Sequence, residues 1–123
     1  MKYSHRLLAS LVSFAALGAA TPAWAHAKLV SSSPADNAVV ATAPSTITLK
    51  FNERVVPAFT KLELTMPEHG GMKVPVKVNV AEDGRTVTGV PEARLGKGVY
   101  RIVWTAASGD GHKMNGNVSF KIG

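Results

Sequence analysis

The chain has 123 residues, a formal net charge of +6 and no cysteine. This length suits one domain, and without cysteine any metal site must use His, Met, carboxylates or a terminal amine rather than thiolates or an iron–sulfur cluster. Lys and Arg are scattered along the sequence rather than interleaved with aromatic residues, which argues against nucleic-acid binding.

The N-terminal segment is typical of a secretory signal peptide. Two basic residues precede an apolar run over residues 7–20, and Ala23-Trp24-Ala25 matches the small-x-small cleavage pattern. The run is shorter than the roughly 20 residues that a membrane span needs. We therefore expect a signal peptide over residues 1–25 and a mature domain over residues 26–123 that begins with His26 and has no membrane span.

Seven segments of the mature chain have the alternating pattern of β-strands. They cover residues 27–32, 46–51, 61–66, 74–80, 85–90, 98–105 and 117–122. Turn signals such as Asp83-Gly84 separate them, and Pro75 places the start of the fourth strand at a sheet edge. The pattern predicts an all-β, immunoglobulin-like Greek-key sandwich of seven strands. Its core is expected to include five aromatic residues, Phe51, Phe59, Tyr100, Trp104 and Phe120.

The direction of the strands sorts the candidate metal ligands into two sets. If consecutive strands run in opposite directions, the loops after the second and sixth strands lie at the same end as His26. These loops carry Glu53, Asp110 and His112. The loop after the third strand, which carries His69, lies at the other end.

The first set offers the donors that Cu(II) prefers. The amine and the imidazole Nδ1 of an N-terminal His26 can close a six-membered chelate ring, and Asp110-Gly111-His112 adds a carboxylate and a second imidazole. Glu53 is a candidate outer ligand or a hydrogen-bond partner of an imidazole. Each of these residues also has an ordinary interpretation as a terminus, a turn or a surface side chain, so a metal-free structural module stays an alternative.

Five segments of the mature chain carry a family resemblance. They are residues 26–34 (HAKLVSSSP), 49–53 (LKFNE), 98–104 (GVYRIVW), 108–112 (SGDGH) and 116–121 (GNVSFK). Together they resemble the CopC family of periplasmic copper-binding proteins. The resemblance implies an immunoglobulin-like barrel that binds Cu(II) through the residues matching His26, Asp110 and His112. It also implies a periplasmic role in copper resistance or homeostasis as a chaperone, buffer or scavenger, beside an inner-membrane copper importer or a multicopper oxidase.

The second set consists of Met66, His69 and Met72, whose thioethers favour Cu(I). Some members of the family resemble this arrangement with a longer methionine-rich loop and a separate Cu(I) site. This segment has only two methionines, and Met66 continues the inward face of Leu62 and Leu64. A place for Met66 in the core is therefore the favoured interpretation, with a weak Cu(I) site as the alternative.

An enzymatic role is the other alternative for the first set. An N-terminal histidine with a second histidine resembles the copper brace of lytic polysaccharide monooxygenases. The mature chain is short and has few aromatic residues for a flat polysaccharide-binding face, and Asp110 would occupy a coordination position that oxygen activation needs open. We therefore expect a copper-binding protein rather than an enzyme.

Overall fold

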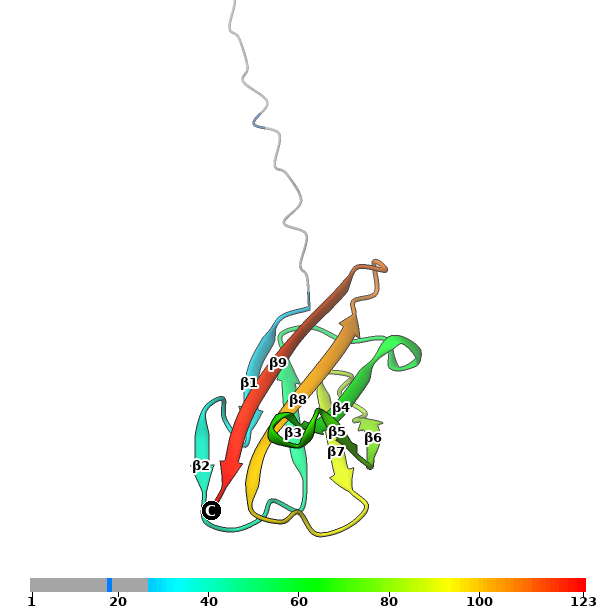
Figure 1. Ribbon diagram of the computed structural model, residues 1–123. Helices are drawn as coiled ribbons and strands as arrows, with labels where there is room; N and C mark the ends of the chain where they lie inside the picture. Colours follow the sequence, from blue (N-terminus) through cyan, green and yellow to red (C-terminus); the bar gives the residue numbers. More distant parts are fainter. Residues whose placement is uncertain (1–17, 19–26) are drawn as a thin grey trace, which may run out of the picture.

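The computed structural model describes Gly18 and residues 27–123, which form two packed β-sheets (Figure 1). One sheet has the order β1-β3-β7-β6, with β1 Leu29–Ser33, β3 Ile47–Phe51, β7 Thr86–Pro91 and β6 Val76–Val80. The other has the order β2-β9-β8-β4-β5, with β2 Ala38–Val40, β9 Lys113–Ile122, β8 Gly98–Ala107, β4 Lys61–Met66 and β5 Met72–Val74. Two 3₁₀-helices complete this part of the chain, η1 Pro57–Phe59 and η2 Pro67–His69. The predicted all-β immunoglobulin-like sandwich is confirmed.

No helix among the described residues is long and apolar enough to cross a membrane. Apart from Gly18, the predicted signal peptide over residues 1–25 lies outside the described residues, and so does His26. Cleavage after Ala25 therefore stays a prediction.

The described chain has nine strands, so the predicted number of seven is too low. Residues 74–80 were expected as one strand, but the chain changes sheets at Pro75: β5 pairs with β4 in one sheet and β6 pairs with β7 in the other. Proline has no N–H to donate to a ladder, which makes it a natural point for this change. The other additional strand, β2, follows a similar change of sheet after β1, where Asn37 N donates to Ser119 O at 2.6 Å.

The two additional strands leave the predicted alternation of directions intact. Strands β1 and β2 both run away from the end where Ala27 lies, and β5 and β6 both run back toward that end (Figure 1). Each pair behaves as one strand that passes from one sheet to the other. The loops after β3 and β8 consequently lie at the Ala27 end, as the sequence predicts.

Aromatic side chains fill much of the space between the sheets. Phe51 meets Trp104 edge to face with ring centroids 5.1 Å apart, and Tyr100 stacks on Phe120 at 5.4 Å. All four are buried, and burial of a side chain of this size contributes about 1.5–3 kcal/mol to stability. The prediction was wrong for Phe59, which is 53% exposed because η1 lies outside the sandwich.

Candidate metal centre

Three segments that are distant in sequence meet at the Ala27 end of the sandwich, which we call the metal pole: residues 27–28, 52–56 and 107–113. Lys28 N donates to Asn52 Oδ1 at 2.7 Å, and Asn52 N donates to Lys28 O at 3.0 Å. Val55 forms an isolated β-bridge with Ser108, and the next amide, Val56 N, donates to a carbonyl at the end of β8 at 2.8 Å. These hydrogen bonds thus fix residues 27–28, the β3–β4 loop and the β8–β9 loop relative to one another.

The β8–β9 loop is a tight turn that carries two candidate ligands. Gly111 N donates to Ser108 O at 2.9 Å, and Ser108 N donates to His112 O at 3.1 Å. Gly111 has a φ of 87°, a conformation that residues with a Cβ rarely adopt. The Asp-Gly-His spacing therefore has a local cause, because the glycine lets Asp110 and His112 approach each other across the turn.

The side chains of Asp110 and His112 are in direct contact. Asp110 Oδ2 lies 2.8 Å from His112 Nδ1. The other carboxylate oxygen, Oδ1, accepts hydrogen bonds from the Ser108 hydroxyl and from His112 N, the latter at 3.1 Å. These interactions, with the Ser108 hydroxyl as the largest contribution, hold the pKa of Asp110 well below its ordinary value.

The contact with the Asp110 carboxylate determines the tautomer of His112. An ionised carboxylate only accepts hydrogen bonds, so Nδ1 must carry the proton that Asp110 receives. The imidazole then has Nε2 as its metal-binding nitrogen. The His112 side chain is 55% exposed, so this edge of the turn is accessible.

Ser108 is a functional candidate that the sequence interpretation did not single out. It is the buried polar residue of the described core, with 2% exposure, and its hydroxyl reaches Asp110. The alternation of β8 in the sequence indicates Ser108. The inward-facing residues of β8 alternate through Trp104 and Ala106, so the next inward position falls on Ser108, where a hydroxyl needs a partner.

The predicted first set is brought together as far as the structure describes it. Asp110 and His112 are in contact, and Glu53 lies half-buried in the neighbouring β3–β4 loop. His26 is outside the described residues, while Ala27, which follows it, is fully buried at this pole. Among the described residues no group of three or more His, Cys, Asp and Glu side chains could hold a metal ion. A complete site at this pole therefore needs a further ligand, and His26 is the predicted one.

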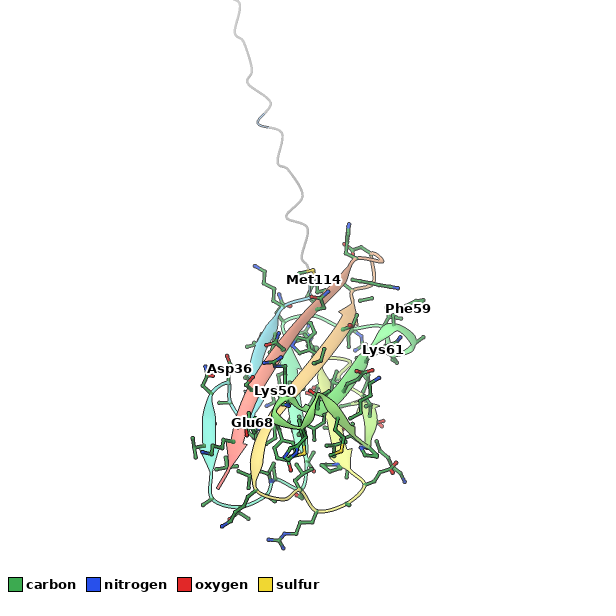
Figure 2. The ribbon with its side chains drawn as sticks, viewed as in Figure 1. Asp36, Lys50, Phe59, Lys61, Glu68 and Met114 are labelled. Carbon is green, nitrogen blue, oxygen red and sulfur yellow. The ribbon has the colours of Figure 1, made fainter. Side chains whose placement is uncertain are left out.

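The second predicted set lies around the β4–β5 hairpin, at the far end of β4. Met66 and Met72 are register partners, and η2 with His69 joins them. Met66 packs against the core, whereas Met72 is 54% exposed and His69 is exposed. Figure 2 shows Glu68 of η2 far from Met114, a partly buried methionine at the metal pole. The structure thus keeps the two sets apart, as predicted, and gives Met66 the expected packing role.

Comparisons with known proteins identify the relatives of this sandwich. The profile of the CopC domain matches residues 29–123. The chain belongs to the CopC domain family. Copper resistance protein C from Xanthomonas campestris pv. juglandis is 39% identical over 126 residues, which cover 98% of each chain.

Two further relatives differ in how much of their own length the match covers. The crystal structure of PcoC, a methionine rich copper resistance protein from Escherichia coli, superimposes with a TM-score of 0.74 at 35% identity and covers 80% of this chain and all of that one. Copper transport protein CutJ from Bacillus subtilis is 34% identical over 101 residues, which cover 81% of this chain and 18% of the longer protein. The same domain thus occurs as most of a short chain and as a small part of a long one.

Proposed function

We propose that the mature chain binds Cu(II) in the periplasm through the amine and imidazole of His26 and the imidazole of His112, with Asp110 beside them. It acts in copper resistance and homeostasis as a chaperone, buffer or scavenger. The observation that carries this proposal is the 2.8 Å contact between Asp110 and His112 on a turn that is fixed at the Ala27 end of the sandwich.

The donor set suits Cu(II). An amine and two imidazoles supply the nitrogen donors that a tetragonal Cu(II) site favours over hard, oxygen-preferring cations. The Asp110 carboxylate holds the imidazole of His112 through Nδ1, which leaves Nε2 for the metal, and it supplies a negative charge that would offset the charge of the ion. Direct ligation by Asp110 requires one of its present hydrogen bonds to open, and Glu53 in the neighbouring loop is the candidate outer ligand.

A carrier rather than an enzyme is supported by the same residues. Oxygen activation needs an open coordination position on the copper ion. The Asp110 carboxylate next to His112 competes for that position. The relatives named as copper resistance and copper transport proteins support a role in handling the ion as cargo. The match within the copper transport protein CutJ supports a role in copper transport. An inner-membrane copper importer and a multicopper oxidase are the candidate partners.

The second set is proposed only as a weak Cu(I) site. The thioethers of Met66 and Met72 lie on neighbouring strands of one hairpin with His69 between them. Because Met66 is engaged in the core, an accessible soft site there would depend chiefly on Met72.

The test is an electron paramagnetic resonance titration of protein that begins at His26, with one equivalent of Cu(II). We expect a tetragonal spectrum with nitrogen hyperfine coupling and strong competition against a Cu(II) chelator. His112→Ala should weaken binding sharply, whereas the matched control His69→Ala should leave it unchanged. Equal losses for the two variants would contradict the assignment of the site to the metal pole. Oxidation of polysaccharide in the presence of a reductant would favour the enzymatic alternative.

A further inference from the structure

The charged side chains of the mature domain are distributed unequally over its surface. Residues 26–123 contain twelve Lys and Arg and eight Asp and Glu, a formal charge of +4. The outer face of the five-stranded sheet carries five of these cations and one of these carboxylates. They are Lys61, Lys73, Arg101, Lys113 and Lys121, with Glu63. We call this the basic face. The remaining seven cations and seven carboxylates cancel, so the basic face accounts for the whole net charge.

The pairing of strands places these residues on one surface. Arg101 is the register partner of Ser119, and Lys61 is the register partner of Thr105. Their chain neighbours Ile102 and Leu62 point into the core, so the cations must point outward. Glu63 forms an ion pair with Lys73 at 3.4 Å, which leaves three lysines and Arg101 as the face's excess charge.

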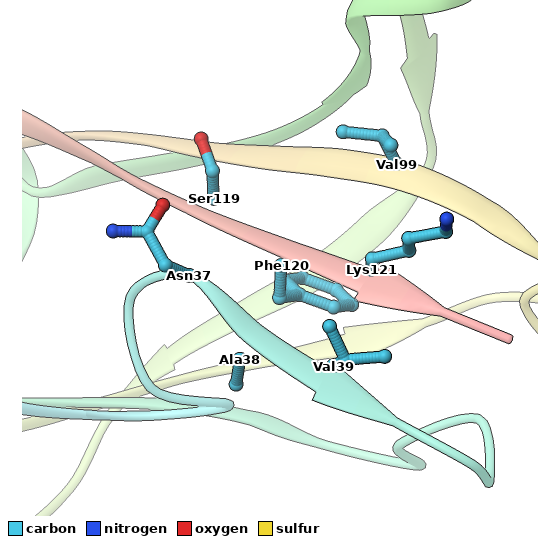
Figure 3. A pocket seen from close by; sticks show the side chains of 7 residues that line it. All are labelled: Asn37, Ala38, Val39, Val99, Ser119, Phe120 and Lys121. Carbon is cyan, nitrogen blue, oxygen red and sulfur yellow. The ribbon is translucent and has the colours of Figure 1, made fainter.

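All five cations of the basic face are exposed. Its exposed apolar side chains are small, with Val39 at 68% and Val103 at 38% exposure. A shallow hollow of about 160 Å³ lies between β2, β8 and β9, lined by residues that include Val39, Val99 and Lys121 (Figure 3). An exposed sheet face with a hollow between apolar side chains is suited to a protein surface that presents one protruding side chain.

The charge of this face selects among possible occupants. A second copy of the chain would bring the same excess of cations, and the N-terminal segment before residue 26 contains Lys2 and Arg6 but no carboxylate. Both would be repelled. A lipid surface is disfavoured because none of the outward-facing residues in these five strands is aromatic, and Phe59 on η1 is the one exposed aromatic ring beside them among the described residues. Interfacial membrane binding uses several Trp, Phe or Leu side chains as anchors.

We propose that the basic face is a docking surface for an acidic region of another protein. The face extends from η2 to the metal pole, where Lys113 directly follows His112 and its Nζ lies 5.4 Å from the centroid of the exposed Phe59 ring. A partner that covers the face would therefore have its edge beside the candidate metal centre. Complementary charge would steer its approach and fix its orientation. Docking itself does not depend on the copper site, whereas its use in copper transfer rests on the proposed function.

The experiment uses two double charge reversals of the protein that begins at His26. Arg101→Glu/Lys121→Glu changes the basic face, and Lys50→Glu/Lys77→Glu makes the same change in net charge on the outer face of the other sheet. A short poly-L-glutamate peptide at low ionic strength is the soluble probe, followed by ¹⁵N–¹H NMR. Vesicles of phosphatidylcholine with phosphatidylglycerol are the lipid probe. Each variant is also tested for Cu(II) affinity and for copper tolerance in a copper-sensitive bacterial host.

We expect the peptide to shift amide signals of β4, β8 and β9, and R101E/K121E to weaken its binding on the order of tenfold more than K50E/K77E does. R101E/K121E should keep its Cu(II) affinity but lose copper tolerance. The proposal is overturned if the two variants weaken peptide binding equally or if R101E/K121E keeps its copper tolerance. It is also overturned if vesicles shift these amide signals and the peptide does not. If the parent fails to bind Cu(II), the proposed function fails, while the peptide titration still tests the face. Should the reversals unfold the protein, Arg101→Gln/Lys121→Gln tests the same face.

Discussion

The buried hydroxyl of Ser108 donates a hydrogen bond to Asp110, and this connects the core of the sandwich to the candidate metal ligands. Ser108 is at the same time the partner of Val55 in an isolated β-bridge. The position of the Asp110 carboxylate, and through it the orientation of the His112 imidazole, is therefore set by backbone that is packed in the core. If this turn holds Cu(II) as we propose, two of the candidate ligands are already ordered before the ion binds.

Removal of this hydroxyl should weaken Cu(II) binding although Ser108 is not a ligand. In Ser108→Ala the carboxylate loses the hydrogen bond that contributes most to its lowered pKa, and the imidazole that it holds is less firmly oriented, so we expect a loss of about tenfold in affinity. Competition with a Cu(II) chelator measures this loss. The control is Ser45→Ala, an exposed serine in the loop between β2 and β3. Affinity equal to that of the parent would mean that Asp110 keeps its position without the hydroxyl.

The ionisation of Asp110 should persist into acid. Hydrogen bonds from Ser108 and His112 lower its pKa in the folded state, so its contribution to stability is present above the pKa of an unfolded aspartate, about 3.9, and is lost as the pH falls through the lowered value. The pKa of Asp83 is lowered for a similar reason, because Arg85 N and Thr86 donate hydrogen bonds to its carboxylate. Carboxyl ¹³C NMR of the metal-free protein should show both groups titrating below the pKa of an unfolded aspartate. A midpoint at or above that value for Asp110 would contradict the hydrogen-bonded turn.

The close contact between Gly116 and Trp104 should make the core sensitive to one methyl group. A Cβ at Gly116 would lie 2.6 Å from Cζ2 of Trp104, which is also packed against Phe51. We expect Gly116→Ala to destabilise the fold by about 1–3 kcal/mol in a denaturant titration. Gly96→Ala is the matched control, because a Cβ there meets nothing within 4 Å. Similar stabilities of the two variants would show that the tryptophan can move without cost.

The sequence predicts the faces of the strands better than it predicts their partners. Alternation places Val76 and Val80 correctly, because a period of two continues unchanged when the chain passes from one sheet to the other at Pro75. The same period of two gives no sign of the change of sheet, because the neighbouring strand is determined by tertiary packing and not by the local pattern. The common end of Asp110 and Glu53 was predictable, because loop positions depend only on strand direction.

The atomic contacts within the turn were not predictable from the pattern. The contact between Asp110 and His112 depends on the φ of Gly111 and on the depth at which β8 ends. Phe59 shows the opposite limitation: its hydrophobicity predicted burial, but the 3₁₀-helix that begins at Pro57 holds it outside the sandwich. Side-chain chemistry alone does not say on which side of a loop a residue lies.

Signal-peptide cleavage should create the Cu(II) site, and this prediction tests the proposal most directly. In the precursor the nitrogen of His26 is part of the peptide bond to Ala25, and an amide nitrogen has no basic lone pair for the metal. The imidazole of His26, Asp110 and His112 would remain, so residual binding should be weaker rather than absent. Protein that begins at His26 is compared with the same protein carrying one additional N-terminal glycine, and circular dichroism verifies that the fold is the same. We expect chelator competition to show a large loss of affinity in the extended form, with fewer nitrogen donors in its paramagnetic resonance spectrum. If the extended form binds Cu(II) as tightly and with the same spectrum, the amine is not a ligand and the site must be built from side chains alone.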